Sequence, residues 1–444
     1  MRIPYHKPLY LSHRLRSVIG GGRRCQVVAP IERSFSSAEA SSPEDPDLPT
    51  FGLSSTILGL FESPTIIKPH IKSIIQLPEV ADALSANNRP VKFEQIDGLR
   101  RATDVFASFQ KGGNEHCATL ALLAEYWQMN AKYSESIAAL EELKEYCSVE
   151  GRGKGEMADV SLALSKAFWL NGEFDQGKQE CDNLLEGTVS FYSPYQELSA
   201  LTGHAINRLM LVDTLDDVFS VRDPFRMVVK QLEGTPSLGL ALSLLNFGVA
   251  EVVYAHVVER ERKVDVPLDG ALRAWRQGLT TLKRASSKNK TLHMAIEARL
   301  RSNMAWALLQ MKGAGDRVDQ ASEFAGDALK IYDSEGMSFR EGFGRTLALV
   351  ATCYHKTSSA VTAEGLFQSS LGENEDLLLI NPLAKLDIRD SIRGYADLCR
   401  DWDRREADAE RLDQKAAAVE SSMPDAWQGK LGIFSSLWFF TSMK

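Results

Sequence analysis

At 444 residues, the chain is longer than one ordinary compact domain, and its 44% apolar and 25% charged residues are typical of a soluble protein with a substantial core. The net charge of −8 disfavours nonspecific binding to nucleic acid, which requires clustered lysine and arginine facing phosphates. No run of about 18 uninterrupted apolar residues occurs, which disfavours a membrane-spanning helix.

Residues 1–35 differ in charge from the rest of the chain. They contain seven basic residues and the single acid Glu32, a formal charge of +6, which leaves −14 for the remainder. A basic, serine-containing segment without a long apolar core is typical of a mitochondrial presequence. The run Arg33-Ser34-Phe35-Ser36 resembles a matrix-protease site. We therefore expect localisation in the mitochondrial matrix or on the matrix side of the inner membrane; the alternative is a disordered basic tail.

Two segments lie between this leader and the first repeat. Residues 36–50 hold three prolines and four acids, which predicts a disordered linker. Residues 51–114 are predicted to be an N-terminal helical extension of undetermined role, in which residues 93–109 form an amphipathic helix.

A pattern of small and aromatic residues first becomes clear in residues 162–184. Gly172 interrupts this stretch, so two short amphipathic helices joined by a turn are predicted. Residues 120–143 show the same pattern, with matching residues at offsets of +3, +9, +12 and +16 from the first small residue. The two matching sets are Ala124, Trp127, Tyr133, Ser136 and Leu140, and Ser165, Phe168, Phe174, Gly177 and Cys181.

This pattern resembles the tetratricopeptide repeat (TPR) family. The resemblance implies an all-α fold over residues 115–417, a right-handed α-solenoid of antiparallel helix pairs with a concave, peptide-binding inner face. Weaker copies downstream give seven small anchor residues in all: Ala124, Ser165, Gly203, Gly248, Ala305, Ala351 and Ala396. Their spacing of 38 to 57 residues exceeds the standard period of about 34 and predicts longer helices or loops.

Residues 418–444 are predicted to form a C-terminal apolar helix, because residues 431–444 read LGIFSSLWFFTSMK. Fourteen residues at about 1.5 Å each cannot span a hydrocarbon core of about 30 Å. Three roles remain open: a helix that caps the solenoid or fills its groove, peripheral membrane contact through Leu431–Phe440, and contact with an obligate partner.

The sequence contains no recognisable catalytic or cofactor motif. It lacks a Walker phosphate loop, a GxSxG elbow, an HExxH pair and a GxGxxG turn after a strand. Its six cysteines are far apart and have no metal-ligand spacing, which indicates free thiols in a reducing compartment. We predict no enzymatic activity, no cofactor and no metal site.

In the TPR family, the first helix of each pair lines the concave groove. Transferring that register implies these inner-facing candidates: Glu125, Lys166, Arg299, Asn303, Trp306, Arg345 and His355. The carboxylate clamp that binds chaperone C-termini in this family is absent, since its slots hold Ala121 and Glu125, then Leu162 and Lys166.

The sequence therefore predicts a non-enzymatic protein-binding scaffold or assembly factor in mitochondria, which holds segments of an unidentified protein partner in its groove. One alternative is a respiratory-complex assembly factor at the inner membrane, suggested by the leader and the aromatic tail. The other is an RNA-associated helical-repeat protein, which would need a basic inner face that the net charge disfavours.

Overall fold

The computed structural model describes residues 100–439, with gaps at residues 102, 105–106, 109–110, 113, 150–153, 188–193, 235, 286–289, 312–315, 335–339 and 375–381. All described residues belong to one compact unit of the chain. The predicted leader, the predicted linker and most of the extension 51–114 lie outside the described residues, as do residues 440–444.

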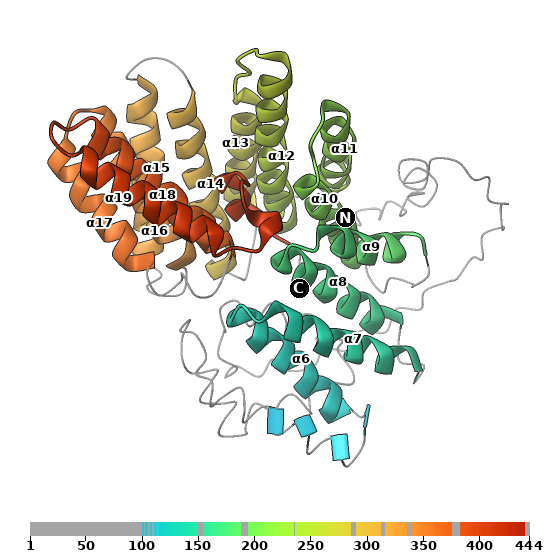
Figure 1. Ribbon diagram of the computed structural model, residues 1–444. Coiled ribbons are helices and arrows are strands. Elements are labelled where there is room, and N and C mark those ends of the chain that lie inside the picture. The colour runs from blue at the N-terminus through green and yellow to red at the C-terminus, as the bar shows by residue number, and fades with distance from the viewer. Residues whose placement is uncertain are drawn as a thin grey trace. The chain divides into compact units, whose positions relative to one another are not determined.

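The described residues form 14 α-helices and no β-strand, in agreement with the predicted fold class (Figure 1). Each helix packs against the next one along the chain, and from α8 onward the first helices of neighbouring pairs also touch. This arrangement is a TPR-like α-solenoid. The pairs are α6 (Asn114–Met129) with α7 (Tyr133–Val149), α8 (Lys154–Asn171) with α9 (Phe174–Leu185), α10 (Pro194–Met210) with α11 (Leu215–Leu232), α12 (Leu238–Arg262) with α13 (Asp269–Arg284), α14 (Lys290–Gln310) with α15 (Asp316–Ser334), α16 (Arg340–Lys356) with α17 (Ala360–Asn374), and α18 (Pro382–Arg400) with α19 (Glu406–Ser421).

The seven small anchor residues fall one in each first helix, and all are buried. Around Ser165, the hydroxyl donates to the Gly177 carbonyl at 2.7 Å and accepts from the Cys181 thiol at 3.2 Å. Both partners lie beyond the turn at Gly172, which takes a left-handed φ of 87° that favours glycine. Helices α8 and α9 therefore run antiparallel, with small residues where they cross.

Gly248 marks the closest approach of α12 and α13. A Cβ at this position would lie 2.0 Å from Trp275 Nε1, and the same Nε1 donates to the Leu245 carbonyl at 3.1 Å. We expect Gly248→Ala to lower the free energy of unfolding by about 3 kcal/mol, because the indole cannot move without losing its hydrogen bond. Urea unfolding measures this. Gly326→Ala in α15 is the control: no atom lies within 4 Å of its Cβ, so it should be neutral or slightly stabilising. Equal effects at the two positions would contradict the close packing.

Long helices account for the long repeat period. α12 has 25 residues and α14 has 21. By length and composition α12 is apolar enough to cross a membrane, the one such helix among the described residues, but 72% of its most apolar window is buried inside the protein. It packs against α10, α11, α13 and α14. The apolar residues on all faces of α12 are therefore explained by its protein neighbours on every side.

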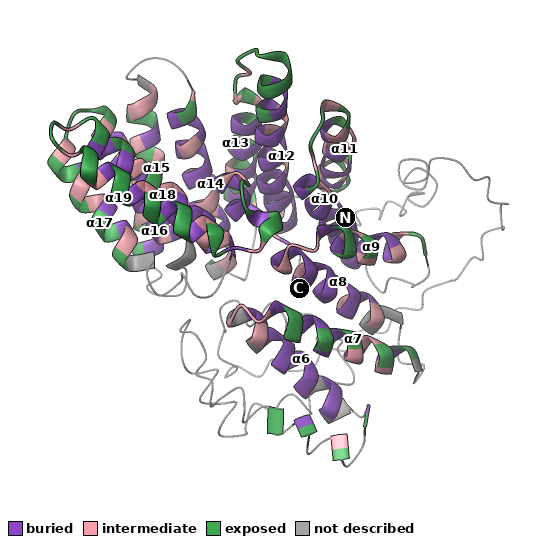
Figure 2. Ribbon diagram, viewed as in Figure 1, coloured by how far each residue is buried: buried purple, intermediate pink, exposed green. Residues whose placement is uncertain are grey.

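The first helices are buried along most of their length, whereas the second helices expose one face (Figure 2). Part of this burial comes from the C-terminal segment, which we define as residues 424–439. The predicted apolar α-helix is wrong for this segment: α19 ends at Ser421, and two short 3₁₀ helices follow, η3 (Asp425–Trp427) and η4 (Gly432–Ser436), each succeeded by extended residues. Pro424, Gly429 and Gly432 all disfavour a continuous helix.

Candidate functional site: the inner groove

We define the inner groove as the face formed by the first helices α8, α10, α12, α14, α16 and α18. The C-terminal segment lies along it. η4 packs against α12, α14 and α18, and Phe439 beyond η4 contacts Trp169 of α8 with ring centroids 4.9 Å apart. The segment therefore connects helices that are far apart in the sequence.

Aromatic packing fixes the start of the C-terminal segment. Trp427 is fully buried, and its Nε1 donates to the carbonyl of Trp169 at 3.1 Å. Its ring packs edge-on against Trp169 and Phe174, with centroids 5.2 and 5.5 Å away. Three residues later, Lys430 Nζ donates to the carbonyl of Met210 at the end of α10, at 2.5 Å. This end of the segment is thus packed against the α8–α9 turn and the end of α10.

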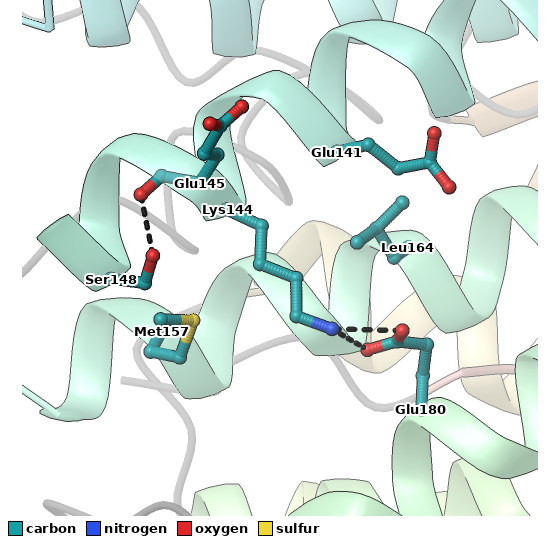
Figure 3. A pocket seen from close by; sticks show the side chains of 7 residues that line it. All are labelled: Glu141, Lys144, Glu145, Ser148, Met157, Leu164 and Glu180. Atoms are coloured by element: carbon teal, nitrogen blue, oxygen red, sulfur yellow. Dashed lines mark hydrogen bonds and ion pairs between the residues drawn. The ribbon is translucent and has the colours of Figure 1, made fainter.

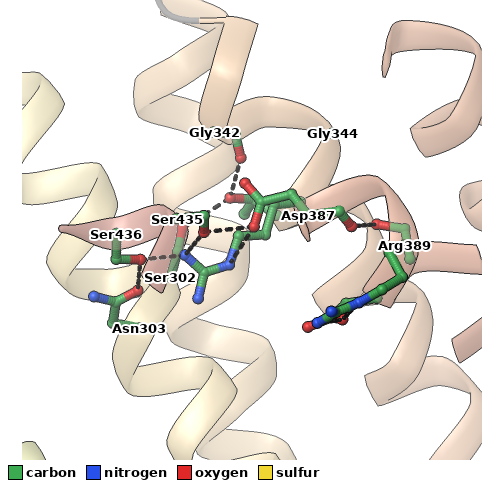
Figure 4. A network of polar contacts seen from close by, with 12 residues as sticks. Ser302, Asn303, Gly342, Gly344, Asp387, Arg389, Ser435 and Ser436 are labelled. Carbon is green, nitrogen blue, oxygen red and sulfur yellow. Dashed lines mark hydrogen bonds and ion pairs between the residues drawn. The ribbon is translucent and has the colours of Figure 1, made fainter. Parts of the chain in front are cut away.

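A buried polar network holds the middle of the C-terminal segment (Figure 4). Ser435 Oγ donates to Asp387 Oδ1 of α18 at 2.6 Å, and Arg345 Nε of α16 lies 3.5 Å from the same oxygen. Arg345 Nη1 donates to Ser436 Oγ, which in turn donates to Asn303 Oδ1 of α14 at 2.7 Å. Three first helices are therefore joined through two adjacent serines.

Asn246 of α12 binds the backbone of the C-terminal segment. Its Oδ1 accepts from the Trp438 amide at 2.9 Å, and its Nδ2 donates to the Trp438 carbonyl at 2.8 Å. Both polar backbone groups of one residue are thus satisfied by a single side chain. The Arg299 guanidinium lies 5.0 Å from the centre of the Trp438 ring, a cation–π distance. Because the Asn246 bonds go to the backbone, they do not depend on which side chain stands at position 438.

The structure brings three of the seven predicted groove residues, Arg299, Asn303 and Arg345, against the C-terminal segment. Trp306 is half-buried against the main core, and His355 Nε2 pairs with Asp401 Oδ2 at 2.9 Å. Glu125 and Lys166 lie on α6 and α8.

Sequence reasoning missed Asn246 and Asp387. Asn246 lies two residues before the anchor Gly248, so the same register points to it. Nothing in the local sequence distinguishes Asp387 from the acids that commonly occupy exposed helix faces.

Glu125 is a buried carboxyl group on α6. It is 4% exposed, and its Oε2 has no hydrogen-bond partner among the described residues. Burial raises its pKa to about 8, although the positive charge of Lys166 acts in the opposite direction. We therefore expect Glu125 to be mostly protonated at pH 7.

Replacing Glu125 with glutamine should remove a pH dependence of stability. The pKa of Glu125 is higher in the folded protein than in the unfolded chain, so its protonated form favours the folded state. This contribution to the unfolding free energy is fully present below pH 4.5 and is lost as the pH rises through about 8. Between pH 5 and 7, the unaltered protein should lose on the order of 2 kcal/mol more unfolding free energy than Glu125→Gln. Urea unfolding at several pH values measures this, with the exposed Glu186→Gln as control. Parallel curves for all three proteins would mean that Glu125 is not buried.

A second candidate site is a surface pocket between α7, α8 and α9 (Figure 3). Its lining residues are Glu141, Lys144, Glu145, Ser148, Met157, Leu164 and Glu180. Its one cation, Lys144, already binds both carboxylate oxygens of Glu180, at 2.6 and 2.8 Å. The described residues contain no group of three histidine, cysteine or acidic side chains that could hold a metal ion. The inner groove is therefore the stronger candidate.

The antiparallel helix pairs and their stacking define the class: a TPR-like helical-repeat protein. No family model and no curated protein sequence matches the chain. Among solved structures, it is similar to the apo form of the quorum sensor NprR from B. thuringiensis, with 12% identity and a TM-score of 0.38, over 73% of this chain and 97% of that one. It is also similar to the human IFIT1 dimer with PPP-AAAA, with 14% identity and a TM-score of 0.35, over 84% of this chain and 72% of that one. The class rests on the chain's own helix pairing.

Proposed function

We propose that this chain is a non-enzymatic protein-binding scaffold of mitochondria whose inner groove holds an extended segment of a partner protein. The observation that carries the proposal is the groove's present occupant, the C-terminal segment. It is held by the Asn246–Trp438 backbone pair, by the network around Ser435 and Ser436, and by aromatic packing at both ends. A surface with this chemistry binds other extended apolar peptides in the same way.

In this proposal the C-terminal segment competes with the partner. It is covalently attached to α19, so its effective concentration at the groove is high. A partner segment binds only when it contacts the groove better than the internal segment does, or when it is present in excess. The groove would therefore select among partners by affinity.

A labelled synthetic peptide of residues 424–444, titrated into the full-length protein, tests this proposal by fluorescence anisotropy. Trp438→Ala in the protein should tighten peptide binding, because it weakens the internal competitor and leaves the groove wall intact. Asn246→Ala should not tighten peptide binding, because the group that it removes binds the backbone of the internal segment and of the peptide alike. No saturable binding to any of the three proteins would contradict an exchangeable groove.

The mitochondrial part of the proposal rests on the basic leader. A reporter carrying residues 1–40 should enter mitochondria, and a diffuse cytosolic signal would remove this part. Assembly of a respiratory complex at the inner membrane is the more specific version of the proposal. Its support now comes from the leader alone, because Ile433, Phe434, Leu437 and Phe439 of the aromatic tail are buried in the protein.

A further inference from the structure

The C-terminal segment leaves two buried hydrogen-bond donors in the groove unsatisfied. Arg345 is 8% exposed and Asn303 is 0% exposed, yet Arg345 Nη2 and Asn303 Nδ2 have no partner among the described residues. Both side chains contact Ser436 through a different atom. A buried donor without an acceptor destabilises the structure, and more so when the donor is charged. The groove therefore offers more donors at this position than its occupant uses.

The charges around Ser436 are also unbalanced. Arg345 and Arg299 lie close to the single carboxylate of Asp387, which leaves one positive charge in excess. A separate group on α18 and α19 is balanced in itself: Arg389 pairs with Asp390 at 2.8 Å and with Glu420 at 3.2 Å, and Arg393 pairs with Glu420 at 2.7 Å. An occupant with a negative charge at this point would complete the balance.

A carboxylate satisfies these donors better than a hydroxyl does. The Ser436 hydroxyl has one proton, which it donates to Asn303 Oδ1, and it accepts from only one nitrogen of Arg345. A carboxylate can accept from both terminal nitrogens of a guanidinium in the bidentate geometry that arginine favours. Rotation of the Asn303 amide by half a turn would then present Nδ2 to the same group.

We propose that the groove recognises a partner segment that carries a carboxylate side chain at the position of Ser436. This inference rests on the proposed function and specifies the partner: a segment with a 3₁₀ turn that ends at the acid, as η4 ends at Ser436, followed by extended residues with an aromatic residue two positions after the acid. The C-terminal segment, with a serine at that position, would then be a weaker ligand that such a partner displaces.

Four full-length variants test the carboxylate preference without any partner. Ser436→Asp should melt a few degrees higher than Ser436→Asn, because aspartate accepts from the unsatisfied donors. At the neighbouring position the order should reverse, with Ser435→Asp melting lower than Ser435→Asn, because Ser435 contacts Asp387. Aspartate and asparagine have the same size, so steric strain cancels within each pair. A Ser436→Asn variant as stable as Ser436→Asp, or more stable, would overturn the inference.

Labelled peptides of residues 424–444 carrying Ser436→Asp or Ser436→Asn extend the test to binding in trans. The aspartate peptide should bind the full-length protein on the order of tenfold more tightly, and this advantage should vanish with Arg345→Gln protein. Equal binding of the two peptides would overturn the carboxylate preference and leave the proposed function standing. Binding of neither peptide would overturn the exchangeable groove, and with it this assignment of the partner.

Discussion

Trp427→Ala should lower the free energy of unfolding by about 3–5 kcal/mol. The indole is fully buried, donates to the carbonyl of Trp169 and packs edge-on against the rings of Trp169 and Phe174. Removing it leaves a cavity between the C-terminal segment and the α8–α9 turn, which are separated by 258 residues in the sequence. Urea unfolding followed by circular dichroism measures the loss.

Trp127→Ala provides the matched control, because Trp127 is only half-buried at the edge of the first repeat's core. We expect it to cost less than half as much as Trp427→Ala. A near-neutral Trp427→Ala, or equal losses at both positions, would show that the C-terminal segment is not packed as described.

Arg345→Ala should be the second large perturbation, with a loss of about 3–5 kcal/mol. Arg345 is the positive charge nearest to the carboxylate of Asp387, and burial already raises the pKa of that carboxyl to about 6. Without the guanidinium, its pKa should rise further, so that the loss becomes smaller at acidic pH. Unfolding measured at pH 5 and pH 7.5 detects both effects.

The double variant Arg345→Ala/Asp387→Ala separates this pairing from general loss of packing. Once the carboxylate is removed as well, no unpaired buried charge remains, so the double variant should cost clearly less than the sum of the single variants. Simple additivity would mean that Arg345 and Asp387 do not interact.

The helix pairs could be predicted because their determinants are local. The residue types at Ser165, Phe174 and Gly177 occur again at the same spacing in the first repeat, and each copy has a small residue where its two helices cross. The structure places each anchor in a different first helix. The long period follows from helices such as α12, which extend the apolar pattern without changing it.

The course of the C-terminal segment could not be predicted, because it depends on residues distant in the sequence. The apolar character of residues 431–440 is evident, but their conformation is set by contacts such as Ser436 with Asn303, 133 residues away, and Trp438 with Asn246, 192 residues away. Such contacts leave no local periodicity. The inner-facing positions of the TPR family, transferred to this chain, include Asn303 and Arg345. Asp387 could be identified only from its contact with Ser435 in the structure.

Photo-crosslinking from the end of the C-terminal segment tests its place in the groove most directly. With Phe439→p-benzoyl-phenylalanine in the full-length protein, irradiation and mass spectrometry should identify intramolecular products with the peptides of α8 and α10 that contain Trp169 and Gly203, because Phe439 contacts both. Products formed only with membrane lipid, or only with a second copy of the chain, would contradict a segment held in the groove of its own chain.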